Sequence, residues 1–384
     1  MSSTSPRCRR PTNVPDQPPR IADALYHDLV SPGEVAVVRR RVREVALRDV
    51  APVADRIARG DERLDGFPRD VFDRLAAAGI YRIPFAADVG GDGLAHPATA
   101  TATAVEELAY FSNSVAAIFD VHCILAGNAV NRGTPEQRRR WLAPVVAGEI
   151  VGAFATSEPA ASSDLSPEAV RPVAHRRGDG WVLNGRKRWI TNSVVAAFVV
   201  VLARTGDRLS TFIVPTDTPG VRVGTPDRKL GNKWQITADV HLDDVELGPE
   251  ALLGTEGGGL KVALQTLTYG RIGIAAAGVG MAQAAFDRTA AHLSTRVAFG
   301  APLAVRQHWQ FLMADRATEI AVQMARDAVQ AFGGFGFTQE LGDDSSGPVE
   351  ALYRDSKIGE IYEGASEVQR WVLARQIFGR DIVG

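Results

Sequence analysis

The order of local sequence signals predicts an α+β protein with an N-terminal helical domain, a small central β-barrel or β-sandwich domain and a C-terminal helical bundle. Helix-start signals and apolar residues at helical spacing dominate up to about residue 149. Short β-branched runs, separated by Gly and Pro, follow. Helical signals then return. We therefore predict a disordered leader at 1–30 and domains at 31–149, 150–255 and 256–384.

Three helix starts support the first helical domain. Ser31-Pro-Gly-Glu34 and Thr134-Pro-Glu-Gln137 each fit a capping box with Pro at the first helical position. Pro68 opens a further helix, which we expect to end at Gly79 with a left-handed cap. The leader is rich in Arg and Pro and lacks the amphipathic pattern of a transit peptide.

The central zone contains four runs typical of strands, at residues 198–202, 210–214, 221–223 and 236–242. Asn184-Gly185, next to strand-like residues, predicts a turn. In the C-terminal zone the apolar run 272–285 is rich in Gly and Ala, which suits a tightly packed helix. Ser366-Glu-Val-Gln369 is a capping box that opens the last helix.

Composition excludes several classes of function. The formal net charge is −2, so no overall basic field favours nucleic acid or an anionic membrane. We find no stretch of about 18 uncharged apolar residues, so we expect no membrane span. Two cysteines, Cys8 and Cys123, form neither a disulfide framework nor a zinc site, which suits a reducing cytoplasm.

Familiar nucleotide, metal and hydrolase motifs are missing from the sequence. The glycine clusters at 254–259 and 333–336 lack the strand and helix context of a dinucleotide site, and neither contains the Gly-Lys-Ser/Thr of a phosphate loop. The seven histidines show no metal-ligand spacing, so we predict no metal site. No Gly-x-Ser-x-Gly elbow indicates a serine hydrolase.

Three longer segments are informative: 154–164, 181–192 and 361–370. They contain Thr156-Ser-Glu-Pro159, Trp189-Ile-Thr-Asn192 and Tyr362-Glu-Gly-Ala-Ser-Glu367. Together they resemble the acyl-CoA dehydrogenase family. Segments 271–278, 296–300 and 328–334 are also similar to family segments, in the family order, and the resemblance runs from about Val35 to Ile377.

The resemblance implies FAD bound between the β domain and the C-terminal bundle, with a neighbouring subunit touching its adenosine end. It places at the flavin Phe154, Thr156, Ser157, Ser163, Trp189 and Thr191. It assigns to the FAD of the neighbouring subunit Arg296, Phe299, Gln307, Gln330 and Gly334. Hydroxyls and backbone N–H groups can satisfy the polar edge of the ring, and an arginine can pair with a pyrophosphate.

Glu363 matches the catalytic base of the family, which removes the α proton of an acyl thioester while hydride leaves the β carbon for the flavin. Tyr362, Gly364 and Arg271 match residues around the substrate, and Ala365 and Glu367 match residues around FAD. Some relatives place the base just before the arginine that matches Arg271. That position is Gly270 here, so Glu363 is the candidate.

The sequence departs from the family pattern in three places. Ala160 and Ser162 replace glycines near the flavin, and Ala365 replaces a threonine that helps to hold FAD. A helical hairpin of the family has no counterpart after Ile320, and neither Gly nor Pro lies between Leu303 and Phe332. Either the helix breaks near 320–322, which we favour, or it continues and residues 330–334 reach a partner subunit.

The sequence therefore predicts a cytoplasmic FAD-dependent dehydrogenase that desaturates the thioester of an acyl-CoA or acyl-carrier protein and passes electrons to an electron-transfer flavoprotein. Because the lost hairpin builds the CoA channel and the subunit interface in relatives, we expect a dimer or a weakened tetramer that binds CoA poorly. Two alternatives stay open. One is an oxidase, monooxygenase or carrier-protein desaturase on the same fold, and the other is a non-catalytic subunit that completes a partner's FAD site.

Overall fold

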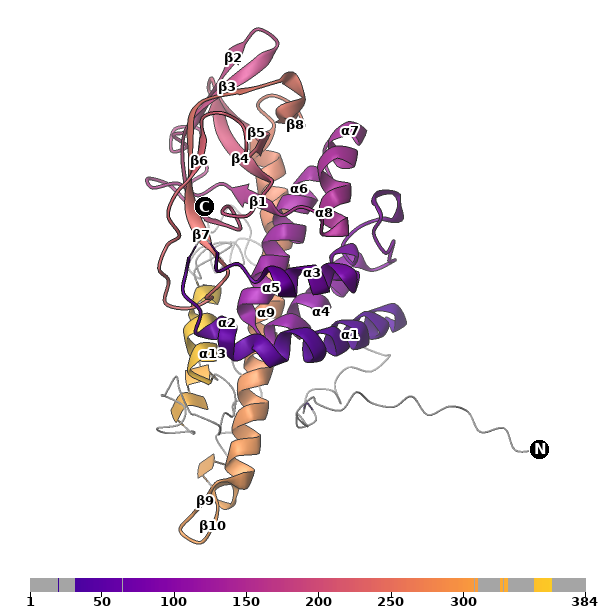
Figure 1. Ribbon diagram of the computed structural model, residues 1–384, viewed down its shortest axis with the longest axis vertical. Coiled ribbons are helices and arrows are strands. Elements are labelled where there is room, and N and C mark those ends of the chain that lie inside the picture. The colour runs from indigo at the N-terminus through magenta and orange to yellow at the C-terminus, as the bar shows by residue number, and fades with distance from the viewer. Residues whose placement is uncertain are drawn as a thin grey trace, which may run out of the picture.

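The computed structural model describes residues 20, 32–63, 65–306, 308–309, 325–326, 328–330 and 349–360. Within these residues a group of helices comes first, a sheet follows, and a single long helix runs past both (Figure 1). The predicted capping boxes at Ser31 and Ser366 and the predicted helix break at 320–322 lie outside the described residues.

The N-terminal helices surround one apolar core. They are α1 (Gly33–Val45), α2 (Ala54–Ala58), α3 (Arg69–Ala77), α4 (Pro97–Ala109), α5 (Asn113–Phe119), α6 (Asn128–Val130), α7 (Pro135–Gln137) and α8 (Ala143–Ala147), with π-helical turns η2 (Ala46–Val50), η6 (Asp120–Gly127) and η7 (Arg138–Leu142) and 3-10 turns η3 (Ala51–Val53), η4 (Ile80–Arg82) and η5 (Ala87–Val89). The two start signals that fall within the structure are confirmed. Pro68 directly precedes α3, and the Thr134 hydroxyl accepts a 3.2 Å bond from the Gln137 N–H as the capping box requires. Gly79 has φ 70°, the predicted left-handed cap.

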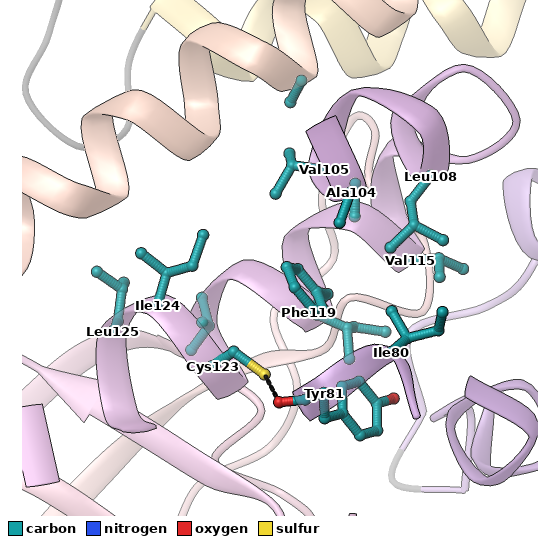
Figure 2. Close-up of a cluster of buried hydrophobic side chains, with 14 of the residues drawn as sticks. Ile80, Tyr81, Ala104, Val105, Leu108, Val115, Phe119, Cys123, Ile124 and Leu125 are labelled. Carbon is teal, nitrogen blue, oxygen red and sulfur yellow. Dashed lines mark hydrogen bonds between the residues drawn. The ribbon is translucent and has the colours of Figure 1, made fainter. Parts of the chain in front are cut away.

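The core of this helical unit is a cluster of buried apolar side chains (Figure 2). Tyr81, Phe119 and Cys123 lie in it together, and the Cys123 thiol donates a 3.9 Å contact to the Tyr81 carbonyl oxygen. Burial raises the pKa of Cys123, which disfavours the reactive thiolate. Cys123 is therefore a core residue.

One stretch within the described residues is long and apolar enough to cross a membrane, which the sequence analysis did not find. It is Asn113–Val130, with a mean hydropathy of 1.3, and 94% of it is buried inside the protein. The stretch includes Asp120 and His122, and His122 contacts the Val145 carbonyl oxygen and the Gly152 N–H. A buried helix of this kind is the core helix of the N-terminal unit, so its apolar composition reflects protein packing.

The strands form one mixed sheet of eight strands in the order β6-β7-β3-β2-β4-β5-β8, with β1 pairing parallel to β4. They are β1 (Gly152–Ala155), β2 (Val173–Arg177), β3 (Gly180–Thr191), β4 (Phe198–Thr205), β5 (Arg208–Pro215), β6 (Val221–Val223), β7 (Thr237–Leu247) and β8 (Leu252–Leu253), and η8 (Pro249–Ala251) precedes β8. The predicted strand runs are confirmed: three lie within β4, β5 and β6, and the run 236–242 begins one residue before β7.

The turn predicted at Asn184-Gly185 is wrong. Both residues lie inside β3, at a register shift where β3 pairs with β7. Gly185 has φ 143°, and a Cβ there would lie 2.6 Å from the Pro172 Cα. The glycine therefore makes a bulge that lets the strand pass close to Pro172, because a β-bulge uses the same backbone freedom as a tight turn.

The long helix α9 (Gly259–Thr295) spans 37 residues, which corresponds to about 55 Å. Its glycines allow close packing against the N-terminal unit, as predicted for 272–285. A Cβ at Gly280 would lie 2.3 Å from the Glu106 carbonyl oxygen, and one at Gly273 would lie 2.0 Å from Asp120 Oδ1. The segments β9 (Val297–Ala298), β10 (Ala301–Pro302) and η9 (Leu303–Val305) follow at the end of α9, and the later α13 (Val349–Ser356) and η10 (Lys357–Glu360) lie beside it (Figure 1).

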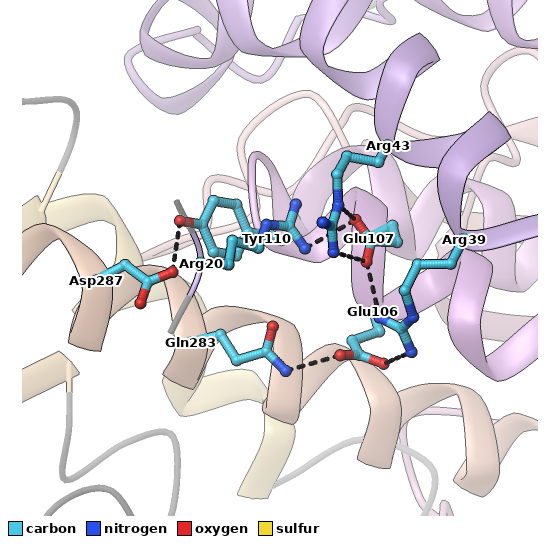
Figure 3. A network of polar contacts seen from close by, with 8 residues as sticks. All are labelled: Arg20, Arg39, Arg43, Glu106, Glu107, Tyr110, Gln283 and Asp287. Carbon is cyan, nitrogen blue, oxygen red and sulfur yellow. Dashed lines mark hydrogen bonds and ion pairs between the residues drawn. The ribbon is translucent and has the colours of Figure 1, made fainter. Parts of the chain in front are cut away.

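A buried polar network joins α1, α4 and α9 (Figure 3). Glu107 accepts bonds from Arg39 at 2.7 Å and from Arg43 at 2.9 Å, and it also pairs with Arg20. The Gln283 amide of α9 donates to Glu106 at 2.7 Å. This network gives the buried carboxylates of α4 charged partners, which offset their desolvation, and it fixes α9 relative to α1 and α4.

Candidate functional site

A cavity of about 550 Å³ lies where the sheet, α5, η6, α9 and α13 meet. One wall is formed by the end of β1, the loop that follows it, and the end of β3. Another is formed by residues 229–235, between β6 and β7. The cavity is large enough for an organic cofactor ring or a small substrate, and it is lined by apolar side chains and a few polar groups, as such sites usually are.

Seven residues predicted from the sequence line this one cavity, although they come from distant parts of the chain. They are Phe154, Thr156, Ser157, Ser163, Trp189, Thr191 and Arg271. The sheet explains part of this convergence, because β1 delivers Phe154 and β3 delivers Trp189 and Thr191. Helix α9 supplies Arg271.

A buried ion pair holds the loop after β1 in place. The Lys187 ammonium contacts Glu158 Oε1 at 3.2 Å and the Thr156 carbonyl oxygen at 3.0 Å. The other Glu158 oxygen accepts a 2.9 Å bond from the Arg171 N–H. Burial lowers the pKa of Lys187 to about 8, while the Glu158 carboxylate acts in the opposite direction. The pair fixes Thr156 and Ser157 against β3, a role that the sequence analysis did not assign.

The end of β3 has an irregular backbone that presents Trp189 to the cavity. Pairing with β7 shifts between Lys187 and Ile190, and Trp189 has φ 58° with 54% of the residue exposed. The next cavity residue, Thr191, accepts a 3.0 Å bond at Oγ1 from the Gln235 Nε2. A hydroxyl that accepts this bond keeps its own hydrogen to donate elsewhere.

Residues 229–235 form a wall of the cavity that sequence reasoning missed. The wall residues are Lys229, Leu230, Gly231, Asn232 and Gln235. Only the Gly231-Asn232 pair gives a local signal, and it is an ordinary turn signal. The position of these residues depends on contacts distant in sequence, described next, which no local pattern encodes.

Helix α13 and the N-terminal unit clamp this wall from two sides. Asp355 accepts a 2.6 Å bond from the Asn232 N–H, and Arg354 donates to the Leu230 carbonyl oxygen at 3.1 Å. On the other side Lys229 pairs with the buried Glu62. Burial raises the pKa of Asp355 to about 6. The clamp joins all three parts of the chain around the cavity.

A close approach to Trp234 adds to the clamp. Gly60 faces the indole so closely that a Cβ there would lie 1.8 Å from its Nε1. The Arg56 guanidinium carbon lies 5.0 Å from the indole centroid, within cation–π range. Trp234 and Asn232 both have positive φ, at 67° and 51°. The surrounding contacts therefore hold this segment in a conformation that isolated residues of these types rarely adopt.

The replaced glycines near the predicted flavin site cause no backbone strain. Neither Ala160 nor Ser162 is among the described non-glycine residues with positive φ, so both are compatible with side chains. Ser162 lines the cavity and adds a hydroxyl to those of Thr156, Ser157 and Ser163. A row of hydroxyls beside a half-exposed indole suits a flat ring with a polar edge.

Three of the residues assigned to a neighbouring subunit's cofactor lie away from the cavity. Arg296 is the C-cap residue directly after α9. Phe299 is 94% exposed with φ 53° between β9 and β10, at the end of the molecule remote from the sheet (Figure 1). Gln330 is exposed in a helical stretch at 328–330. None of the three lines the described cavity.

The remaining predicted residues lie outside the described part of the chain. They are Glu363, Tyr362, Gly364, Ala365, Glu367, Gln307 and Gly334. Their predicted roles stay predictions. Among the described residues no group of three or more His, Cys, Asp or Glu side chains could hold a metal ion.

Comparison with protein families gives three matches along the chain. The models are the acyl-CoA dehydrogenase N-terminal domain over residues 33–149, the middle domain over 153–245 and the C-terminal domain over 257–322 and 316–378. The C-terminal match comes in two pieces that overlap at 316–322, the position where the sequence predicts a lost hairpin.

Individual relatives extend over nearly the whole chain. The mitochondrial short-chain specific acyl-CoA dehydrogenase of Mus musculus is 34% identical, with 91% of each chain covered, and a probable acyl-CoA dehydrogenase of Bacillus subtilis is 34% identical, covering 90% of this chain and 98% of that one. Butyryl-CoA dehydrogenase from Megasphaera elsdenii has a similar structure, with a TM-score of 0.82 at 28% identity over 90% of this chain and 98% of that one. A chain in a structure of the electron transferring flavoprotein of Acidaminococcus fermentans also gives a TM-score of 0.82, at 30% identity, with 91% of this chain and 98% of that one covered.

Proposed function

Because the chain belongs to the acyl-CoA dehydrogenase family, we propose that it is an FAD-dependent oxidoreductase that desaturates an acyl thioester between its α and β carbons. The observation that carries the proposal is the convergence of seven predicted site residues on one cavity between the sheet, α9 and α13. The relatives are named as acyl-CoA dehydrogenases, so the reaction class is an oxidation of a CH–CH bond.

FAD, when bound, supplies the two-electron acceptor for the hydride. The hydroxyls of Thr156, Ser157 and Ser163 would hold its polar groups, and Trp189 would cover the ring. Thr191 would donate its hydroxyl hydrogen into the cavity, because Gln235 already occupies a lone pair of the same oxygen. The Glu158–Lys187 pair keeps this wall rigid without touching the ligand itself.

Glu363 is the proposed base. Its carboxylate would take the α proton, the electron pair of the Cα–H bond would form the new double bond, and the hydride that leaves the β carbon would reduce FAD. The thioester carbonyl must be polarised for the α proton to become acidic, and backbone N–H groups near the base would supply that stabilisation. Arg271 lines the cavity and would order this region. Gly270 carries no side chain that could act in place of Glu363.

Part of the cavity lining is apolar. Val121 of η6 and Leu264 and Leu267 of α9 line it, and a bound cofactor and substrate would complete the exclusion of water from the reacting carbons. Excluding water strengthens electrostatic interactions with the developing enolate and protects a reduced cofactor.

We further propose that the enzyme works in the cytoplasm, uses a CoA or carrier-protein thioester and passes electrons to an electron-transfer flavoprotein. The two-piece match of the C-terminal domain supports a shortened hairpin and hence weaker binding of the CoA moiety. Reoxidation of the reduced enzyme by a purified electron-transfer flavoprotein, with slow reoxidation by oxygen, would support this acceptor over the oxidase or monooxygenase alternative. Cell fractionation tests the location.

The test of the proposed function is the visible absorption spectrum of purified protein before and after an acyl thioester is added without oxygen. We expect an oxidised flavin band that bleaches on addition of butanoyl, pentanoyl or hexanoyl thioesters. A protein that stays colourless after incubation with FAD would instead indicate a non-catalytic subunit.

A further inference from the structure

Arg20 is buried inside the protein, although it belongs to the segment before α1. Only 7% of the residue is exposed, and it is the one residue among 1–31 that the structure describes. An arginine is almost never buried unless it is paired. A specific site must therefore offset the cost of taking its guanidinium group out of water.

A carboxylate and two aromatic rings form a cage around the Arg20 guanidinium (Figure 3). The Arg20 Nη1 lies 2.7 Å from the Glu107 Oε2, and the Glu107 side chain is 0% exposed. The guanidinium carbon lies 3.6 Å from the centroid of the Tyr110 ring and 5.4 Å from that of Phe111. A planar guanidinium can pair with a carboxylate and stack on an aromatic face at the same time, which an ammonium group cannot match. We call Glu107, Tyr110 and Phe111 the guanidinium cage.

The guanidinium cage lies where α4 meets α9. Glu107 belongs to α4, and Tyr110 is the C-cap residue of this helix. The Tyr110 hydroxyl donates a 2.9 Å bond to the Asp287 Oδ2 of α9. Burial raises the pKa of Tyr110 and the Asp287 carboxylate acts in the same direction, so the hydroxyl stays protonated and can donate. Arg20 therefore stacks on the ring that links the two helices.

The cage does not depend on Arg20 for its own charge balance. Arg39 and Arg43 of α1 contact the Glu107 carboxylate at 2.7 and 2.9 Å. Glu107 therefore keeps counter-ions when Arg20 is absent, and we expect the helical unit to fold without it. The contact with Arg20 adds an attachment point for the N-terminal segment to a unit that α1 and α4 already form.

The chain is long enough to bring Arg20 back to the cage. Twelve residues separate Arg20 from Gly33, the first residue of α1, and an extended chain of that length reaches about 40 Å. The cage lies beside Arg39 and Arg43, which are within the same 13-residue helix as Gly33. The connection therefore requires no strain in α1.

We propose that the cage is a binding site for an arginine guanidinium, and that Arg20 fills it so that the N-terminal segment forms a strap across the junction of α4 and α9. The sequence predicts a disordered leader at 1–30, and the cage ties that leader to the fold at one point. The strap contains no residue of the proposed catalytic site, so this inference does not rest on the proposed function.

Cleavage by trypsin after Arg20 tests whether the cage holds this residue in solution. A peptide of residues 11–30 contains Arg20 as its one trypsin site, and it serves as the unprotected reference. Mass spectrometry gives the rate of cleavage between Arg20 and Ile21 in the peptide and in the full chain. The rate in the full chain follows the fraction of molecules in which Arg20 has left the cage. We expect it to be at least about tenfold lower than in the peptide, because opening breaks a charge-assisted contact and a cation–π contact.

Arg20→Lys tests the selectivity of the cage, because trypsin also cleaves after lysine. The variant keeps the positive charge and loses the planar group, so its cleavage rate should come close to that of a peptide with the same lysine. Arg176→Lys is the matched control. Arg176 lies on β2, stacks at 4.2 Å on the Trp181 ring and pairs with Glu256 at 2.8 Å, so the control makes the same change at a similar contact outside the cage. It should leave the protection of Arg20 unchanged.

Hydrogen exchange tests the strap itself. Backbone amides of α9 around Asp287 should exchange faster in Arg20→Lys than in the parental chain, because the Tyr110 ring that bonds Asp287 loses its stacking partner. The same amides in Arg176→Lys should match the parent.

Each outcome decides a part of the inference. Equal cleavage after Arg20 in the parental chain and in the peptide would overturn the binding site, and this comparison needs no variant. Full protection in Arg20→Lys would show that the cage does not select a guanidinium. Loss of protection with unchanged exchange in α9 would overturn the strap and leave the binding site. None of these measurements uses a thioester, so the proposed function is tested separately.

Discussion

Thr191 and Gln235 show how a single hydrogen bond can set the chemistry of the cavity wall. The Gln235 amide donates to the Thr191 hydroxyl at 3.0 Å, and both residues line the cavity. With that lone pair occupied, the hydroxyl hydrogen is available to an acceptor on the ligand. Thr191 belongs to Trp189-Ile-Thr-Asn192, a segment that resembles the family pattern. Gln235 lies in a segment that the sequence did not assign to the site.

Gln235→Met should weaken FAD binding by about two- to tenfold, the effect of losing one ordinary hydrogen bond. Fluorescence titration of the apoprotein with FAD measures the change, and Thr191→Val gives the partner variant. Because both changes act through the same hydroxyl, the double variant should be no weaker than Thr191→Val alone. Fully additive effects would show that Gln235 acts independently of Thr191.

The buried ion pair between Lys187 and Glu158 is the second residue-level contact that shapes the cavity wall. Lys187→Met leaves the Glu158 carboxylate buried without its counter-ion, so we expect the free energy of unfolding to fall by about 3–5 kcal/mol. The double variant with Glu158→Gln removes both charges and should recover most of that loss. Urea unfolding of the three proteins gives the comparison. A single variant as stable as the parent would mean that the ion pair does not hold the loop.

At the scale of elements, the positions of most strands could be predicted from the sequence, whereas the contacts that clamp residues 229–235 could not. The predicted strands fall in β4, β5, β6 and β7 because β-branched residues pack well in a sheet, and the almost wholly buried strands β4 and β5 need no alternation with exposed polar residues. Asn184-Gly185 misled the prediction, since glycine with positive φ serves a bulge as well as a turn. The wall at 229–235 takes its shape from Glu62 and Asp355, which are distant in sequence.

Asp355 gives this clamp a defined dependence on pH. Burial raises its pKa to about 6 from an ordinary value of 3.8, so the folded state binds this proton more tightly than the unfolded state. The stability that this group contributes is therefore present below the unfolded value and is lost as the pH rises through about 6.

Asp355→Asn keeps an acceptor for the Asn232 N–H and removes the titration. The difference in the free energy of unfolding, parent minus variant, should therefore fall by up to about 3 kcal/mol between roughly pH 4 and pH 7. Urea unfolding across that range measures it. A difference that stays constant with pH would show that Asp355 does not titrate in this window.

At the scale of the whole molecule, α9 connects the three parts of the fold. It packs against the N-terminal helices through Gly273 and Gly280, and its Arg271 lines the cavity. The β9–β10 hairpin, which contains Phe299, follows its C-terminal end at the far end of the molecule from the sheet (Figure 1). Tyr269, Ile272 and Val279 are large apolar residues exposed on α9. The order of the domains could be predicted from the local helix and strand signals, but these exposed surfaces depend on which parts of α9 its neighbours cover.

We predict a dimer or a tetramer that dissociates on dilution, because the two overlapping pieces of the C-terminal match support the loss of the helical hairpin that the family resemblance places at the subunit interface. Light scattering over a range of protein concentrations measures the mass. We also expect weak binding of CoA itself in calorimetry. A tetramer independent of concentration, together with tight CoA binding, would contradict this view of the hairpin.

The central claim is that this chain oxidises an acyl thioester with Glu363 as the base, and anaerobic stopped-flow reduction of the bound flavin tests it most directly. The parental protein should bleach its flavin band with a thioester substrate. Glu363→Gln should retain FAD and bleach about a hundred- to ten-thousandfold more slowly, the usual contribution of a general base. Equal rates in the two proteins, with FAD bound in both, would contradict the account.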